Sequence, residues 1–161
     1  ILKRHTGSLI LKRIFDIIIA SLLLIVLSPV LLVLSVLIKT DSKGPVFFRQ
    51  VRVTRYGKTF RIFKFRTMVN NADKIGTQVT TKGDARVTNI GKKLRGCRLD
   101  ELPQLLNILT GDMTFVGTRP EVEKYVSHYT NEMKATLLLP AGVTSLASIE
   151  YKKSDRSHVV L

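Results

Sequence analysis

The sequence predicts an α+β fold: a mainly helical, monotopic membrane protein with one short β-hairpin and further interfacial or amphipathic helices. Three observations lead to this prediction. Residues 14–38 form one long apolar run, residues 46–68 have the pattern of two strands around a turn, and leucines recur at helical spacing from residue 99. We expect an N-terminal re-entrant helix–break–helix over residues 1–40 and one compact domain over residues 41–161.

Composition narrows the class of protein. The 161 residues include 26 Lys and Arg against 12 Asp and Glu, a formal net charge of +14, although 45% of the residues are hydrophobic. A basic chain with a long aliphatic run suits an anionic membrane surface or a phosphorylated substrate better than nucleic acid, so no nucleic-acid partner is expected. The single cysteine, Cys97, excludes an internal disulfide and a cysteine-cluster metal site.

The apolar run at residues 14–38 is long enough to enter a lipid bilayer, since about 20 apolar residues cross its core. It passes into Lys39 without the small-residue cleavage site of a secretory signal peptide. Ser28 and Pro29 lie near its middle, where proline removes a helical hydrogen bond. These two residues therefore predict a membrane break.

Charges on both flanks bear on how this run meets the membrane. Lysines and arginines precede it at positions 3, 4, 12 and 13 and follow it at positions 39, 43, 49, 52 and 55. A spanning helix normally carries its Lys and Arg excess on the cytoplasmic side only. The charge pattern therefore favours a helix that enters and leaves by the same face, and the alternative is a spanning helix with a tolerated proline.

Residues 46–54 and 59–68 predict two strands, with Tyr56 and Gly57 at the turn between them. From residue 39 to residue 68 there are nine Lys or Arg and a single acid, Asp41. We interpret most of these cations as a solvent-exposed basic face, and we expect some of them to contact lipid headgroups. Phenylalanines between them leave RNA binding as a second interpretation. The polar residues 70–84 predict a surface loop.

The stretch at residues 99–120, LDELPQLLNILTGDMTFVGTRP, concentrates residues that carry chemistry. Leucines at positions 99, 102, 106 and 109 predict a helix that ends at Gly111 and tolerates Pro103 in its first turn. Asp100 then lies at or beside a helix N-terminus, which favours anions. Asp100, Glu101 and the later Arg119 together suggest phosphoryl chemistry, whereas an ordinary helix cap is the alternative for Asp100.

Apolar and aromatic residues at positions 122, 125, 129, 133 and 137 predict one more helix. Their spacing places them on one face, which we expect to pack into the core. An interfacial helix is the alternative, because tyrosines favour the headgroup level of a membrane.

Several motifs in a fixed order carry a resemblance to a known family. They are R-I-F-D, the apolar run with Ser28-Pro29, G-P-V-F-F-R-Q, F-K-F-R-T-M, L-D-E-L-P-Q-L-L-N and G-D-M-T-F-V-G-x-R-P. Together they resemble the bacterial sugar transferases, the monotopic phosphoglycosyl transferases that load a phospho-sugar onto polyprenol phosphate. The resemblance implies a re-entrant helix in the lipid bilayer of the bacterial inner (cytoplasmic) membrane, a catalytic domain facing the cytoplasm, and Mg²⁺ as cofactor.

The resemblance also implies roles for the matched residues. Asp100 would be the nucleophile and would bind the metal; it would attack the β-phosphate of a UDP-sugar, expel UMP and pass the phospho-sugar to polyprenol phosphate. Adjacent helical side chains point about 100° apart, so Glu101 would hold a different catalytic role. The implied substrate-binding residues are Lys64, Arg66, Arg95, Arg119 and Pro120. Surface charge is an equally good interpretation for Lys64 and Arg66.

The sequence departs from the family's pattern at three places. Thr118 stands where proline is usual, and G-V-T-S-L-A-S-I at residues 142–149 replaces the commoner G-I-T-G-W-A-Q-V-N-G-R. Relatives continue beyond the position of Leu161, so the domain at residues 41–161 is expected to be C-terminally incomplete. The expected function is the first step of lipid-linked glycan assembly, for capsule, exopolysaccharide, O-antigen or glycoprotein glycan. The alternative is a membrane-anchored, non-catalytic basic module that binds anionic lipid or RNA.

Overall fold

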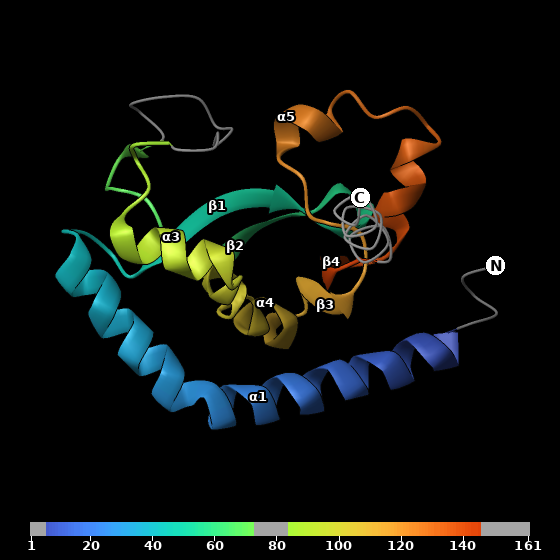
Figure 1. Ribbon diagram of the computed structural model, residues 1–161. Coiled ribbons are helices and arrows are strands. Elements are labelled where there is room, and N and C mark those ends of the chain that lie inside the picture. The colour runs from blue at the N-terminus through green and yellow to red at the C-terminus, as the bar shows by residue number, and fades with distance from the viewer. Residues whose placement is uncertain (1–5, 73–83, 146–161) are drawn as a thin grey trace, which may run out of the picture.

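The computed structural model describes residues 6–72 and 84–145. One long helix lies along one side of an α+β body that the other elements form (Figure 1). The α+β prediction and the predicted hairpin are both confirmed. In chain order the elements are α1 (Thr6–Asp41), β1 (Phe47–Val53), η2 (Arg55–Gly57), β2 (Thr59–Phe65), α3 (Asn89–Gly96), η3 (Leu99–Glu101), α4 (Gln104–Thr110), β3 (Met113–Val116), α5 (Glu123–Val126), η4 (Met133–Leu138) and β4 (Ala141–Thr144).

Helix α1 is bent near its middle, as Figure 1 shows, and it contains Pro29. Proline has no N–H to give to the carbonyl four residues earlier, which here belongs to Ile25. The Ser28 hydroxyl donates to that same Ile25 carbonyl at 2.7 Å. The predicted kink is therefore present, but the residues on both sides of Pro29 belong to one continuous helix, so the predicted break is a bend.

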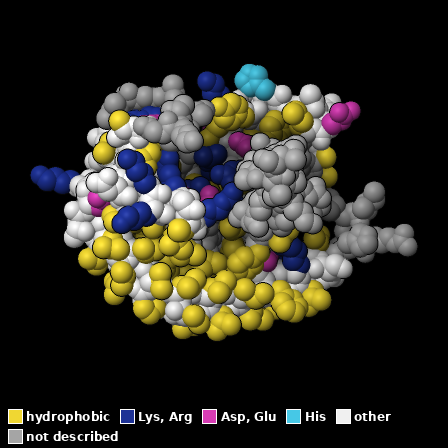
Figure 2. All heavy atoms as spheres, in the orientation of Figure 1, with side chains coloured by type: hydrophobic (Ala, Val, Ile, Leu, Met, Phe, Trp, Pro, Cys, Tyr) yellow, Lys and Arg dark blue, Asp and Glu magenta, His cyan; other side chains and the backbone are white. Residues whose placement is uncertain are grey.

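One side of α1 is buried against the body and the other side is apolar and exposed. Ala20 is fully buried and Ile38 is 2% exposed. Figure 2 shows the exposed hydrophobic side chains as a broad band along the edge where α1 lies. Within residues 6–72 and 84–145, α1 is the one helix long and apolar enough to cross a membrane. Its exposed apolar residues include Ile10, Ile18, Leu22, Ile25, Val26, Leu32 and Val33.

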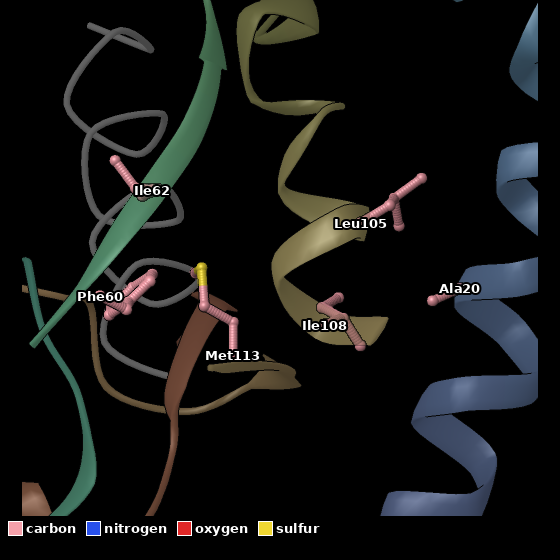
Figure 3. Packing of buried hydrophobic residues seen from close by; sticks show 6 residues of the cluster. All are labelled: Ala20, Phe60, Ile62, Leu105, Ile108 and Met113. Atoms are coloured by element: carbon pink, nitrogen blue, oxygen red, sulfur yellow. The ribbon is translucent and has the colours of Figure 1, made fainter. Parts of the chain in front are cut away.

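The two halves of α1 pack into two different hydrophobic cores. The N-terminal half brings Ala20 to Leu105 and Ile108 of α4, and β2 and β3 close the other side of α4 (Figure 3). The C-terminal half brings Ile38 to a second core with Phe65 and Leu94. Both halves of the apolar helix are thus fastened to the same body.

Polar contacts also fasten the N-terminal half of α1. Asp16 is 7% exposed and accepts hydrogen bonds from Thr114 of β3 at 2.6 Å and from Lys12 at 3.0 Å. Arg13 donates to the carbonyl of Ile108 at 2.6 Å, near the C-terminal end of α4. It also donates to the carbonyl of Leu109 at 3.1 Å. Helix ends leave carbonyls without helical partners, and the Arg13 guanidinium satisfies that of Leu109, whereas the Ile108 carbonyl also accepts from the Gly111 N–H.

Asp16→Ala is expected to lower the free energy of unfolding by about 2 kcal/mol, because it removes two hydrogen bonds to a buried charged group. The melting temperature of the purified protein in detergent measures this effect. Glu132→Ala is the matched control, since Glu132 is exposed and its side chain caps no helix. Equal melting temperatures for the two variants would contradict the prediction.

The hairpin pairs β1 with β2 in antiparallel register, with Lys64 opposite Phe48. Tyr56 and Gly57 both have positive φ, 58° and 74°, which places the turn where it was predicted. Asn107 of α4 fixes the hairpin to the helix: its Oδ1 accepts from the Phe63 N–H at 2.8 Å. The second sheet is a parallel pair of β3 and β4.

The helix predicted from residue 99 is divided in two. A 3-10 turn, η3, comes first, and Pro103 then stands at the N-cap of α4. Proline has no N–H to donate, which accounts for the interruption. Gly111 ends α4 with φ 91°, as predicted.

The prediction of one helix over residues 122–137 is wrong. Two short segments, α5 and η4, stand there instead, and the predicted core residues Tyr125 and Met133 are 48% and 51% exposed. Between them, Ser127 and Thr130 make hydrogen bonds between their side chains and the backbone. Serine and threonine compete in this way with the helical pattern of bonds. Most of the predicted loop at residues 70–84, namely 73–83, lies outside the described residues.

Candidate active site

Glu101 is the centre of a charged cluster that three elements bring together. Its Oε1 atom lies 2.7 Å from Nζ of Lys64 on β2 and 3.8 Å from Nη2 of Arg119, which follows β3. The side chains of Lys64 and Glu101 are 18% and 15% exposed, so this ion pair is largely shielded from water. Arg119 is 56% exposed and reaches the carboxylate from the solvent side.

Asp100 lies beside this cluster in η3 and is half-buried. Burial raises the pKa of its carboxyl group, Lys64 opposes that rise, and Glu101 adds to it. The side chain of Asp100 caps neither η3 nor α4, whose N-cap residues are Arg98 and Pro103. The helix-cap alternative is therefore not what the structure shows. A partly desolvated carboxylate of this kind is available to react with an electrophile.

Arg95 belongs to α3, and its charge lowers the pKa of the Asp100 carboxyl group, after the larger effects of burial, Lys64 and Glu101. Its Nε donates to the Thr67 hydroxyl at 2.8 Å, which fixes the guanidinium. Helix α3 packs directly on the chain after β2: a Cβ at Gly91 would lie 2.1 Å from the Thr67 carbonyl oxygen. The side chain of Thr88 caps the helix by accepting from the Gly91 N–H at 3.0 Å.

The loop that carries Arg119 is held by close backbone contacts. The Gly142 N–H donates to the Thr118 carbonyl at 2.7 Å, and a Cβ at Gly142 would lie 2.2 Å from the Gly117 nitrogen. Pro120 is buried, and its carbonyl accepts from Arg52 at 3.2 Å. Pro120 therefore anchors the loop, while the Arg119 side chain stays exposed beside Glu101.

The remaining predicted residues lie elsewhere. Arg66 is 5% exposed, and its Nη2 donates to the carbonyl of Ile38 at 3.2 Å and to that of Ser42 at 2.6 Å. These contacts tie the C-terminal end of α1 to the body, and a role for Arg66 in substrate binding stays a prediction. Ser28 and Pro29 lie inside α1 and take part in none of the ion pairs of the charged cluster.

Two hollows adjoin the cluster, and Arg119 lines both. The larger has a volume of about 340 Å³ and includes Thr54, Glu121 and Tyr129. Figure 2 shows Lys and Arg side chains gathered around acidic ones in the hollowed centre of this face. The smaller hollow is lined by Arg52, Ile62, Lys64, Glu101, Gln104, Arg119, Pro120, Gly142 and Val143.

Two lining residues escaped prediction from the sequence, Arg52 and Gln104. Arg52 belongs to a hairpin with many cations and has no distinguishing neighbour in the sequence. Gln104 is 3% exposed. It stands among leucines in the sequence, and a polar amide on an apolar helix face is the one sign that could have marked it as a site residue.

The carboxylates present fit a magnesium ion that a substrate helps to bind. Mg²⁺ is usually held by one or two carboxylates together with substrate phosphates. In the described part of the chain no three His, Cys, Asp or Glu side chains gather, so an all-protein metal site is not formed there. Asp100 is the carboxylate suited to this role, because Glu101 is already paired with Lys64.

An acidic pair among cations, beside a long apolar helix, is an arrangement compatible with a membrane-associated protein. The chain belongs to the bacterial sugar transferase family: the model of that family matches residues 7–160. The resemblance inferred from the motifs is thereby confirmed.

Relatives with descriptive names support this membership. The chain is 45% identical over 147 residues to a UDP-glucose:undecaprenyl-phosphate glucose-1-phosphate transferase of Klebsiella pneumoniae, covering 88% of this chain and 31% of that protein. It is 45% identical over 123 residues to a UDP-N-acetylgalactosamine-undecaprenyl-phosphate N-acetylgalactosaminephosphotransferase of Aeromonas hydrophila, covering 76% and 29%. It is 48% identical over 112 residues to the exopolysaccharide production protein PSS of Rhizobium leguminosarum bv. phaseoli, covering 69% and 56%. The chain spans about a third of the length of the first two.

Proposed function

We propose that this chain transfers a sugar-1-phosphate from a UDP-sugar to polyprenol phosphate and so starts the assembly of a lipid-linked glycan. The names of two relatives describe such a transfer from UDP-glucose or UDP-N-acetylgalactosamine to undecaprenyl phosphate. The observation that carries the proposal is the half-buried Asp100 beside Glu101, which Lys64 and Arg119 approach to 2.7 and 3.8 Å.

The reaction proceeds in two displacements at phosphorus. An Asp100 oxygen attacks the β-phosphorus of the UDP-sugar, the bond to the bridging oxygen breaks, and UMP leaves with that electron pair. The polyprenol phosphate oxygen then attacks the same phosphorus, which forms the lipid diphosphate and restores the Asp100 carboxylate. A covalent intermediate of this kind replaces one difficult step by two easier ones.

The neighbouring residues have separate roles in this scheme. Arg95 and Arg119 bind phosphate oxygens through charge-assisted hydrogen bonds. Lys64 holds Glu101 and leaves Asp100 free to react. Mg²⁺, when bound at Asp100, supplies positive charge to the phosphoryl group in transfer.

UMP release tests the proposal. The full-length protein in detergent, given polyprenol phosphate and a mixture of UDP-sugars, is expected to release UMP with Mg²⁺ present and to stop when the metal is chelated. Absence of UMP release with every UDP-sugar would overturn the proposal.

The acid limb of the pH–rate profile is expected to report Asp100. The nucleophile must be ionised, and burial raises its pKa, so kcat/KM should fall at a higher pH than the value of about 3.9 for an ordinary aspartate. Lys64 lowers this pKa, so Lys64→Gln should move the limb to still higher pH. Lys58→Gln, at an exposed position of the same hairpin, should leave the limb in place. A limb that does not move in Lys64→Gln would contradict the assignment.

We propose that α1 is re-entrant, at the cytoplasmic face of the bacterial inner membrane. Contacts at both ends of the helix support this topology: Asp16 bonds Thr114 at 2.6 Å, and Asp41 accepts from the Ile90 N–H at 3.0 Å. A helix whose ends lay on opposite sides of a bilayer would lose one of these contacts. The membrane-bound acceptor would then reach Asp100 from the surface on which α1 lies.

Cysteine labelling tests this topology. Single cysteines placed at Ser8 and Lys43, in a variant without Cys97, are expected to react with an impermeant reagent from the same side of the membrane. Cys97 is exposed on the body and, in the unaltered protein, reports the side on which the body lies. Labelling of Ser8 and Lys43 from opposite sides would show that α1 spans.

A further inference from the structure

Helix α3 is capped in part by another element. Its own N-cap residue, Thr88, accepts from the Gly91 N–H, and its first turn contains no acidic residue. The carboxylate of Asp41, the last residue of α1, accepts from the Ile90 N–H at 3.0 Å. A carboxylate is favourable at the positive N-terminal end of a helix. The end of α1 therefore holds the start of the helix that carries Arg95 near its other end.

Arg66 fastens the same end of α1 to the chain that follows β2. Its Nη2 donates to the carbonyls of Ile38 and Ser42, at 3.2 and 2.6 Å, and to the Ser42 hydroxyl at 3.0 Å. Gly44, whose φ is 132°, passes so close that a Cβ there would collide with the Arg66 Nη1. Arg66 is 5% exposed and lines neither of the two hollows, so its guanidinium meets the chain and not solvent.

Stability alone does not account for an arginine at this position. The Arg66 Nε and Nη1 are buried and have no hydrogen-bond partner among the described residues, which costs free energy. A buried charge can often be replaced by a well-packed apolar side chain without loss of stability. What the guanidinium adds is direction, because its three hydrogen bonds fix where α1 ends.

The next residue, Thr67, connects this junction to Arg95. The Thr67 hydroxyl accepts from the Arg95 Nε at 2.8 Å, and the Thr67 carbonyl accepts from the Thr88 N–H at 3.1 Å. The second hydrophobic core joins the same parts of the chain, namely α1, β2 and α3. Arg66 and Thr67 are therefore adjacent residues, one of which holds the end of α1 and the other the Arg95 guanidinium.

We propose that Arg66 is a positioning residue for Arg95: it fixes the junction of α1, Thr67 and α3, and so sets where the Arg95 guanidinium meets the donor phosphate. The inference rests on the proposed function, in which Arg95 binds phosphate oxygens. Rates of group transfer are sensitive to misplacement of a binding group by about 1 Å. A looser junction therefore lowers the rate although Arg66 itself touches no substrate.

A double-mutant cycle on UMP release tests the proposal. Arg66→Gln is expected to lower kcat/KM for the UDP-sugar about tenfold when Arg95 is present, and by less than about twofold in the Arg95→Lys background. Arg95→Lys keeps a cation for the phosphate but lacks the Nε that Thr67 holds. A loss that came only from partial unfolding would be the same factor in both backgrounds, so equal factors would overturn the proposal.

Asp16→Ala is the matched control, since it removes hydrogen bonds that fasten the other half of α1. Its effect on kcat/KM should be the same factor with Arg95 and with Arg95→Lys. If the Asp16→Ala factor depended on Arg95 as strongly as the Arg66→Gln factor does, any loosening of α1 would produce the coupling. That result would overturn a specific role for Arg66.

Arg66→Lys carries the test if Arg66→Gln does not fold, because it keeps the charge and loses the forked donor. We expect a loss of about threefold that again requires Arg95, and equal factors in the two backgrounds would overturn the proposal. The outcome is separable from that of the proposed function. UMP release with equal factors overturns the positioning role and leaves the transferase proposal standing, whereas absence of UMP release with every UDP-sugar overturns both.

Discussion

Asp100→Asn is expected to reduce UMP release by about 10³-fold or more, because an amide is a very poor nucleophile. The substitution keeps the shape of the side chain, and it removes a carboxylate whose ionised form burial disfavours. The melting temperature is therefore expected to stay the same or to rise slightly. Release of UMP and thermal melting, measured on the same preparation, separate loss of chemistry from loss of fold.

A matched control exists on the other side of α4. Asp112 is also an aspartate next to a helix end, and its carboxylate accepts from the Thr110 hydroxyl at 2.8 Å. Asp112→Asn is expected to keep nearly full turnover, since Asp112 follows the C-terminal end of α4, whereas Asp100 and Glu101 precede its N-terminal end. If Asp100→Asn kept turnover as Asp112→Asn does, Asp100 could not be the nucleophile.

Gly142→Ala is expected to cost about 1–3 kcal/mol of folding free energy and most of the activity. A Cβ at this position would lie 2.2 Å from the Gly117 nitrogen and 2.6 Å from the Gly117 Cα, and backbone atoms of a paired strand cannot easily move away. Any shift would pass through Thr118 to Arg119, because the Gly142 N–H is bonded to the Thr118 carbonyl. Melting in detergent and UMP release measure the two losses.

Gly96→Ala is the control for that substitution, since a Cβ at Gly96 would meet nothing within 4 Å. It is expected to melt and react like the unaltered protein. Equal melting temperatures for Gly142→Ala and Gly96→Ala would show that the close approach of Gly142 to Gly117 does not constrain the fold.

Local patterns predicted the elements whose causes are local. The turn at Tyr56 and Gly57, the end of α4 at Gly111 and the bend near Pro29 each follow from the backbone chemistry of one or two residues. The failed helix at residues 122–137 shows the limit of apolar spacing, because side-chain bonds to the backbone prevailed over it.

The charged cluster could be anticipated only in part. The motifs indicated Glu101 and Lys64, but their contact joins residues 37 positions apart and depends on how β2 packs against η3. Lys64 and Arg66 both belong to the stretch predicted as the second strand. Lys64 contacts Glu101, whereas Arg66 contacts the chain at the C-terminal end of α1. Arg52 gave no signal, because a buried unpaired nitrogen is a property of the fold and not of the sequence.

The central claim is that Asp100 carries the phospho-sugar, and peptide mass spectrometry tests it most directly. The protein is exposed to a UDP-sugar without polyprenol phosphate and then digested. We expect the peptide that contains Asp100 to gain the mass of one phospho-sugar, and Asp100→Asn to gain none. UMP release from an Asp100 that stays unmodified, or the same added mass in Asp100→Asn, would contradict the account.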